Sequence, residues 1–306
     1  MSTLQNIFAI PELRRRIMFT LGMLAVYRIG CHVPTPGIDA HVLAKFFEGT
    51  EGTLLGLVSA FTGGALSQMA VFALGIMPYI SSSIIFQLLT VVFEPIEKLS
   101  KEGEQGRKKI TQYTRYGTIV LAVIQGTGIA TGLQSMVGPA GEPVVPNPGI
   151  GFILMTVITL TAGTAFIMWL GEQITERGIG NGISLIIFAG IVAGTPSAIV
   201  NSIRLVDTGA MTVTTVVFIL ALMLLVVAAI VYMESARRRV PIHYAKRVVG
   251  MRNMGGQASH LPLKINMSGV IPPIFASSIM MFPATIANFI DAPWVKTVSA
   301  YLAPSH

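Results

Sequence analysis

Runs of 18 or more apolar residues recur along this 306-residue chain, and they constrain its fold more than any other feature. The sequence is 52% hydrophobic and only 11% charged, about half the charged fraction of an ordinary soluble domain. A water-soluble protein with one large core does not need apolar runs of this length so often. The pattern therefore predicts an all-α, polytopic membrane protein.

Seven apolar segments are expected to cross the membrane, and the charges of the loops orient them. With the N-terminus in the cytoplasm, 17 of the 21 lysines and arginines fall in cytoplasmic segments, as the positive-inside rule requires. This arrangement places the other end of the chain on the outer side. The expected spans are residues 17–33, 54–93, 116–136, 150–171, 183–203, 212–233 and 267–290.

The second apolar segment is too long for a single crossing. Its 40 residues would extend ~60 Å as one straight helix, about twice the thickness of the hydrocarbon core. A break near Gly75 and Pro78 leaves residues 76–93 as a full crossing, so the piece at about 56–74 must enter from outside and return. Irregular backbone at that depth needs protein or water around it, which favours a cavity open to the outside. The alternative is a proline-kinked helix approached along the membrane surface.

The predicted spans lack the groups that ion coupling or catalysis requires. Arg28 lies near the outer end of the first span, and Glu172 and Glu176 lie at the inner end of the fourth. A coupled transporter or an intramembrane enzyme needs an acidic, histidine, nucleophilic or metal-binding group at depth, and no HExxH, Gly-x-Ser-x-Gly or Walker motif occurs. We therefore expect no enzyme and no cofactor. A non-conducting scaffold stays open as an alternative to a channel.

Four long blocks of sequence resemble one known family. They are ALGIMPYISSSIIFQLLT, EGEQGRKKITQYTRYGT, WLGEQITERGIGNGISLIIFAGIVAG and LPLKINMSGVIPPIFASSIMMFPATIA. They closely resemble bacterial SecY, the pore-forming subunit of the protein-conducting channel, in order from about Pro11 to Ile290. Members of that family have ten spans, so the resemblance covers the first seven. It implies an inverted-repeat helical bundle with one half at residues 1–203, a hinge loop at 204–211 and part of a second half at 212–306.

The resemblance also assigns roles to three groups of residues. The re-entrant piece at about 56–70 resembles the plug helix, which closes the outer funnel and here contains Thr62, Gly63, Gly64 and Ser67. Five isoleucines correspond to the pore ring, an apolar constriction that excludes water and ions: Ile76, Ile80, Ile183, Ile187 and Ile274. Five polar residues lie on the lateral gate, through which apolar segments reach lipid: Ser81, Ser82, Gln87, Gln125 and Asn266. Each gate residue bonds either across helices or to a carbonyl of its own helix, and the sequence does not decide between these.

The loop at residues 234–266 is long and strongly basic. Membrane sidedness alone accounts for that charge, but the resemblance adds a docking arm for the ribosome and the ATPase SecA. The expected contacts are Lys246, Arg247 and Arg252, and those with ribosomal RNA would be salt-sensitive. The other implied partners are the SecE and SecG subunits, signal peptides, nascent chains and membrane lipid. The implied location is the cell inner membrane, where the protein translocates secretory polypeptides and inserts membrane proteins.

Overall fold

The computed structural model describes residues 10–39, 42–43, 59, 62–136, 141–242, 247–249, 252–254 and 259–266. The chain divides into two compact units, a larger one that includes Met1–Pro196 and a smaller one formed by Ser197–Ile274. The predicted seventh span, the ring residue Ile274, the docking residue Lys246 and the first part of the expected plug lie outside the described residues.

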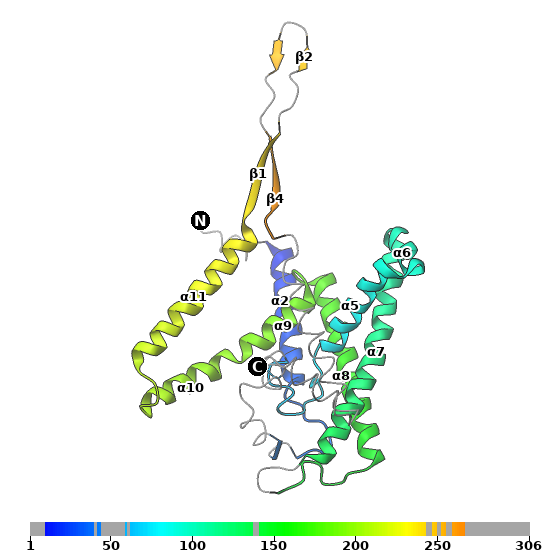
Figure 1. Cartoon of the computed structure of the whole chain (residues 1–306), viewed down its shortest axis with the longest axis vertical. Coiled ribbons are helices and arrows are strands. Elements are labelled where there is room, and N and C mark those ends of the chain that lie inside the picture. The colour runs from blue at the N-terminus through cyan, green and yellow to red at the C-terminus, as the bar shows by residue number, and fades with distance from the viewer. Residues whose placement is uncertain are drawn as a thin grey trace. The chain divides into compact units, whose positions relative to one another are not determined.

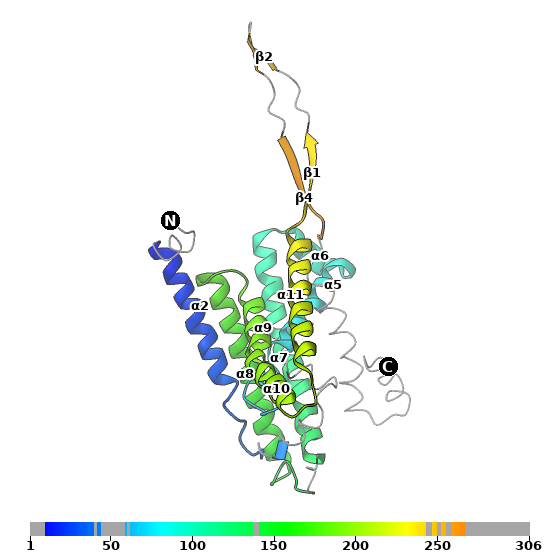
Figure 2. The same cartoon turned by 90° about the vertical axis from the view of Figure 1, so that its left-hand side faces the viewer.

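The larger unit is a helical bundle (Figures 1 and 2). Helix α7 packs along both α8 and α5, whereas α2 packs against α8 and α9. Local sequence explains several helix starts. Pro11 and Pro78 lie in first turns, where a backbone N–H would have no partner within the helix, so its absence costs nothing. At the start of α9, the Asn181 side chain accepts hydrogen bonds from backbone amides of the first turn. The helices are α2 (Pro11–Gly30), α5 (Met77–Val92), α6 (Glu94–Lys101), α7 (Glu104–Ser135), α8 (Ile150–Arg177) and α9 (Gly182–Ala193).

The predicted break in the second apolar segment is confirmed, because α5 begins at Met77. Gly75, just before it, has a φ of 56°, a left-handed conformation that glycine adopts most readily. Of the piece expected to form the plug helix, Ser59 is helical among the described residues, whereas residues 62–70 are not. Residues 62–76 form consecutive turns, since Gly63, Gly64 and Met69 all have positive φ angles that a regular helix does not accommodate. We call Thr62–Ile76 the turn segment.

The smaller unit contains α10 (Thr195–Asp207), α11 (Val213–Ser235) and two short antiparallel ladders (Figure 1). Strand β1 (Arg237–Ile242) pairs with β4 (Ser259–Lys264), and β2 (Arg247–Val249) pairs with β3 (Arg252–Met254). The all-α prediction is therefore wrong for the basic loop. Its Val240 and Ile242 favour extended backbone, and pairing with a distant partner strand, which the local sequence does not reveal, completes the ladder.

Among the residues that the structure describes, four helical segments are long and apolar enough to cross a membrane, or five if α5 and α6, which meet at a 96° bend, form one span. The four are α7, α8, α11 and the continuous stretch Gly182–Asp207 that comprises α9 and α10. The predicted count of seven is not confirmed. Helix α2 misses the criterion because Arg14, Arg15, Arg16 and Arg28 leave no sufficiently uncharged stretch of 18 residues within it.

The turn segment lies between the two hydrophobic clusters of the larger unit. Leu66, Met69 and Leu74 belong to one cluster together with apolar residues of α7 and α8. Phe72 and Ile76 belong to the other, with residues of α2, α8 and α9. A stretch without regular secondary structure thus joins both cores, and the surrounding helices pack against it from several sides.

Replacing Gly163 of α8 by alanine is expected to destabilise the larger unit. A Cβ at this position would overlap the backbone carbonyl of Val71 in the turn segment, so the helix or the segment must move. Overpacking of this kind typically costs about 1–3 kcal/mol, which thermal unfolding in detergent micelles would detect as a lower midpoint.

Gly151→Ala is the matched control for that change. Gly151 lies in the same helix, and nothing is within 4 Å of the Cβ that alanine would add. An unchanged or higher midpoint for Gly163→Ala, as expected for the control, would show that α8 does not press on the turn segment.

Candidate functional site

The turn segment is held in part by close contacts at two of its glycines. At Gly63, whose φ is 66°, an added Cβ would lie 3.0 Å from the Cα of Gly190 in α9. At Gly75, the same atom would lie 2.9 Å from the methyl group of Thr62. At both positions a side chain would lack space, and the positive φ angle of the backbone also favours glycine. This fit brings α9 and the two ends of the segment together.

The middle of the segment is anchored by main-chain bonds and by a stack of aromatic rings; we call Met69–Phe72 its root. The Thr35 amide donates to the Met69 carbonyl at 2.9 Å, and the Val71 amide donates to the Val33 carbonyl at 2.8 Å. The Phe72 ring stacks on Tyr27 of α2 at 6.0 Å and on Phe166 of α8 at 5.9 Å between centroids. The root is thus fixed by the chain that follows α2 and by two helices.

The start of the segment, Thr62–Gly64, is held differently, and we call it the tip. The guanidinium of Arg28 donates to the Gly63 carbonyl, with 2.7 Å between Nη1 and the oxygen. The Tyr27 hydroxyl and the Cys31 thiol both donate to the Thr62 carbonyl, at 3.3 Å and 3.9 Å. Side chains from little more than one turn of helix at the end of α2 therefore satisfy two successive carbonyls. The bond from Arg28 is charge-assisted and is the shortest of the three.

Four of the five predicted ring isoleucines belong to one cluster in the larger unit. Ile76 is buried in it, and Ile80, Ile183 and Ile187 are partly buried and pack against it. Helix α5 and the residue before it supply the first pair, and α9 supplies the second. The structure thus places these four side chains in or against one hydrophobic cluster. Their role as a pore ring stays a prediction.

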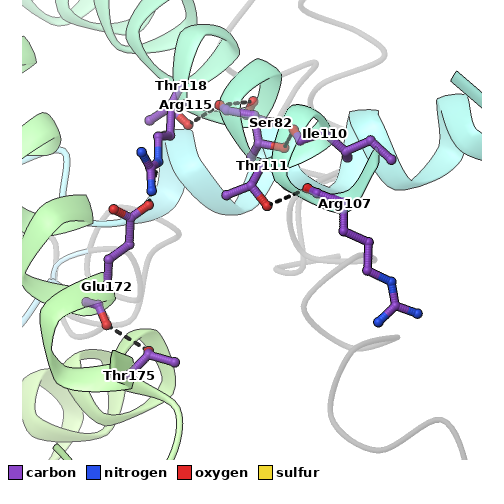
Figure 3. A network of polar contacts seen from close by, with 10 residues as sticks. Ser82, Arg107, Ile110, Thr111, Arg115, Thr118, Glu172 and Thr175 are labelled. Atoms are coloured by element: carbon purple, nitrogen blue, oxygen red, sulfur yellow. Dashed lines mark hydrogen bonds and ion pairs between the residues drawn. The ribbon is translucent and has the colours of Figure 1, made fainter. Parts of the chain in front are cut away.

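The predicted gate residues have varied surroundings. Ser82 of α5 is buried and donates to the Thr114 carbonyl of α7 at 2.8 Å, so it bonds between helices (Figure 3). Ser81 and Gln125 are half-buried, whereas Gln87 is exposed. Asn266, in the smaller unit, donates to the Glu234 carboxylate at 2.7 Å. These contacts do not test the gate itself, which stays a prediction.

Polar contacts continue from Ser82 of α5 to α7 and α8 (Figure 3), and one more reaches α9. Thr118 donates to the same Thr114 carbonyl at 2.7 Å, and one turn of α7 away Arg115 pairs with Glu172 of α8 at 2.7 Å. Thr175 of α8 then accepts the Gly182 amide at the start of α9, at 2.9 Å. This network ties α5, α7, α8 and α9 together at one end of the bundle.

Sequence reasoning missed the residues that hold the turn segment. In the sequence Arg28 is an ionisable residue at a span end with no predicted role, and Tyr27 and Phe72 look like ordinary apolar residues of a span. The one sign of this role in the sequence is the position of Arg28 near the end of a span, because a charged side chain in or close to the membrane needs a partner. Of the predicted docking residues, Arg247 and Arg252 lie on the paired strands β2 and β3.

Comparison with known proteins identifies the family of this chain. The family model of SecY matches residues 70–305. The protein translocase subunit SecY of Escherichia coli K12 is 54% identical over 297 residues, which are 96% of this chain and 67% of that protein. Among solved structures, a protein-conducting channel has a TM-score of 0.60 at 18% identity, and Sec61 in the canine ribosome-channel complex from the endoplasmic reticulum has 0.58 at 17%.

Both solved structures align with 99% of this chain, which covers 64% of each of them. The chain therefore spans about two thirds of the length of its relatives. Fold and comparisons together define a mostly helical membrane protein with the SecY/Sec61 channel fold. The chain belongs to the SecY family.

Gly30→Ala is expected to loosen the root. A Cβ at Gly30 would overlap the Phe72 ring, which cannot turn aside because Tyr27 and Phe166 stack on it. Cys31, the only cysteine of the chain, is 1% exposed beside this site and reports any displacement. We expect its alkylation by a small maleimide, measured over time in membranes, to accelerate at least severalfold.

The control is Gly22→Ala, in the same helix but with nothing within 4 Å of the added Cβ. It should leave the alkylation rate of Cys31 unchanged. Equal rates in wild type, Gly22→Ala and Gly30→Ala would mean that Phe72 does not fix the root.

Proposed function

We propose that this chain is the central subunit of a protein-conducting channel, in which the turn segment is the movable seal. The observation that carries the proposal is the way the segment is held: it fills the core of the larger unit, and side chains at the end of α2 bind the carbonyls of its tip. Membership of the SecY family and the channel fold support the same function. The channel moves secretory polypeptides across the membrane and inserts membrane proteins into it.

In this mechanism the closed state has two barriers. The tip is bound to Arg28, Tyr27 and Cys31, and the isoleucines of α5 and α9 close around the space that follows it. An apolar constriction blocks ions by excluding water, so no charged filter is needed. An arriving signal sequence would part the helices, release the tip and widen the ring. Isoleucine side chains then surround a passing peptide without offering it a hydrogen bond.

Partners and orientation belong to the same proposal. The excess of lysine and arginine in alternate loops supports a cytoplasmic N-terminus in the cell inner membrane. The canine Sec61 structure, solved in a complex with the ribosome, supports a ribosome as one partner. We propose that β2 and β3, which carry Arg247 and Arg252, form part of the docking arm for the ribosome and SecA. SecE and SecG complete the channel, and the lateral gate at α5 and α7 opens toward lipid.

A photo-crosslinking residue in place of Ile80 tests the protein path directly. In membranes that contain this chain and its partner subunits, a stalled secretory polypeptide should crosslink to position 80, because the proposal puts the path beside the cluster on which Ile80 packs. The crosslink should disappear when the signal sequence is defective. The product is measured as a shifted band that contains both chains.

Position 219 provides the control, because Ile219 of α11 is a 48% exposed apolar residue outside the ring. The E. coli relative, carrying the probe at its aligned residue, shows that the assay works. Crosslinking in that relative but not at position 80 of this chain would overturn the channel assignment. A non-conducting scaffold is then the better description.

Arg28→Gln tests the seal separately. Losing a partly buried, charge-assisted bond costs about 1–2 kcal/mol, so the released tip should be populated roughly 5–30 times more often. We expect a larger ion leak through channels reconstituted in liposomes, recorded as a faster decay of an imposed potassium gradient. Cys31 should also be alkylated faster, since the tip covers it.

Arg204→Gln removes the same charge from an exposed position in α10 and should change neither readout. If Arg28→Gln and Arg204→Gln leak equally, Arg28 does not hold the seal closed. A normal crosslink at position 80 together with that result would leave the channel intact and assign its closure to other contacts.

A further inference from the structure

Four helices of the larger unit form two tight pairs. Helices α5 and α7 are joined by the buried bond from Ser82 to the Thr114 carbonyl, and a Cβ at Gly117 of α7 would lie 2.5 Å from the Ser82 hydroxyl. Helices α8 and α9 approach each other backbone to backbone, because a Cβ at Gly182 would overlap the Gly171 carbonyl. Contacts this close leave the members of a pair little freedom to separate, so each pair is expected to move as a unit.

The two pairs meet where α7 packs along α8, and the character of this interface changes along its length. Toward the end of α7 and the start of α8, Ala130 and Leu133 of α7 share a hydrophobic cluster with Phe152 and Leu160 of α8. The second cluster reaches Ile174 near the end of α8 and contains no residue of α7 in the described part of the chain. Apolar packing therefore joins the two helices mainly at the first of these ends.

Arg115 and Glu172 join α7 and α8 toward the other end (Figure 3). Nε of Arg115 donates to the Glu172 carboxylate at 2.7 Å, and among the described residues this is the one polar side-chain contact between the two helices. The side chain of Glu172 is 20% exposed and that of Arg115 is 45% exposed, so water screens the pair only in part. Without the guanidinium, a largely buried carboxylate would lose its partner, which is costly.

Helix α5 follows α7 in any motion at this end. Its Tyr79 lies within the electrostatic reach of both charges of the ion pair. Tyr79 and Ile80 also pack against the hydrophobic cluster on which Ile183 and Ile187 of α9 pack. Since α5 is bound to α7, parting α7 from α8 here would draw Tyr79 and Ile80 away from α9.

We propose that the Arg115–Glu172 ion pair is a latch that sets how strongly the channel stays closed, and therefore which signal sequences open it. The apolar contact between α7 and α8 is the pivot, and breaking the ion pair lets α5 and α7 swing away together at the latch end. A bound segment shifts such an equilibrium only by its differential affinity for the open state, so a stronger latch excludes weaker signal sequences. The threshold rests on the proposed channel function, whereas the latch itself does not.

Distances between spin labels test the latch without any transport. In the full chain with Cys31→Ser, labels at positions 108 and 184 report the latch end, and labels at positions 135 and 151 report the pivot; all four positions are exposed. Pulsed electron resonance should show a longer-distance population at the latch end that grows roughly fivefold in Arg115→Gln, which is about the most that a partly exposed ion pair contributes. The distance at the pivot should stay the same.

Two comparisons separate the ion pair from general damage. Glu172→Gln should have a smaller effect than Arg115→Gln, since it leaves the more exposed partner unpaired, and the double variant should not exceed Arg115→Gln, because both changes break one contact. Lys98→Gln breaks the exposed pair with Glu94 inside α6 and should leave every distance unchanged. Unchanged distances in Arg115→Gln, an equal change in Lys98→Gln or additive effects in the double variant would each overturn the latch.

The threshold is measured with the crosslink at position 80. A secretory polypeptide with one leucine of its signal sequence replaced by serine should crosslink weakly in the wild type and roughly fivefold better in Arg115→Gln, whereas an intact signal sequence should gain little. An unchanged weak-signal crosslink together with lengthened distances would overturn the threshold and leave an ion pair that only stabilises the bundle. Absence of any crosslink in the wild type would overturn the channel function and the threshold with it, while the spin-label distances would still decide the latch.

Discussion

The larger unit depends on satisfying the backbone of a turn inside an apolar bundle. Each peptide group of the turn segment that leaves water needs a hydrogen-bond partner, because the surrounding helices have used their own groups internally. The chain after α2 supplies main-chain partners to Met69 and Val71, and α2 itself supplies side-chain donors to Thr62 and Gly63. The position of α2 follows from this requirement as much as from apolar packing.

Small residues follow from the same constraint. The segment reaches these partners only where neighbouring helices let its backbone approach closely, at Gly163 of α8 and Gly190 of α9. At Gly30 of α2, the space that a side chain would fill is taken by the Phe72 ring. Glycines in three helices, separated widely in sequence, thus serve one buried turn. Their usual cost in helix propensity is offset by the packing that they permit.

The interruption of the second apolar segment was predictable because length and local chemistry agree on it. Forty residues exceed one crossing, and Gly75 and Pro78 mark the break. The contacts that hold the turn segment were not predictable, since Tyr27, Phe72 and Phe166 come from three elements and look alike as apolar residues. The β1–β4 ladder escaped prediction for a related reason: it depends on which distant residues pair, as Arg237 does with Lys264.

The root and the tip of the turn segment differ in what their displacement would break. Moving the root breaks two main-chain bonds and pulls Phe72 from between two rings, and burial of a side chain of that size alone is worth about 1.5–3 kcal/mol. Moving the tip breaks three side-chain contacts from the end of α2, of which only that of Arg28 is charged, and separates Gly63 from Gly190 of α9. Water can replace those partners once the tip moves outward. On the proposed function, motion of the seal is therefore confined to the tip while the root keeps the bundle assembled, so that closure and stability depend on different residues of one segment.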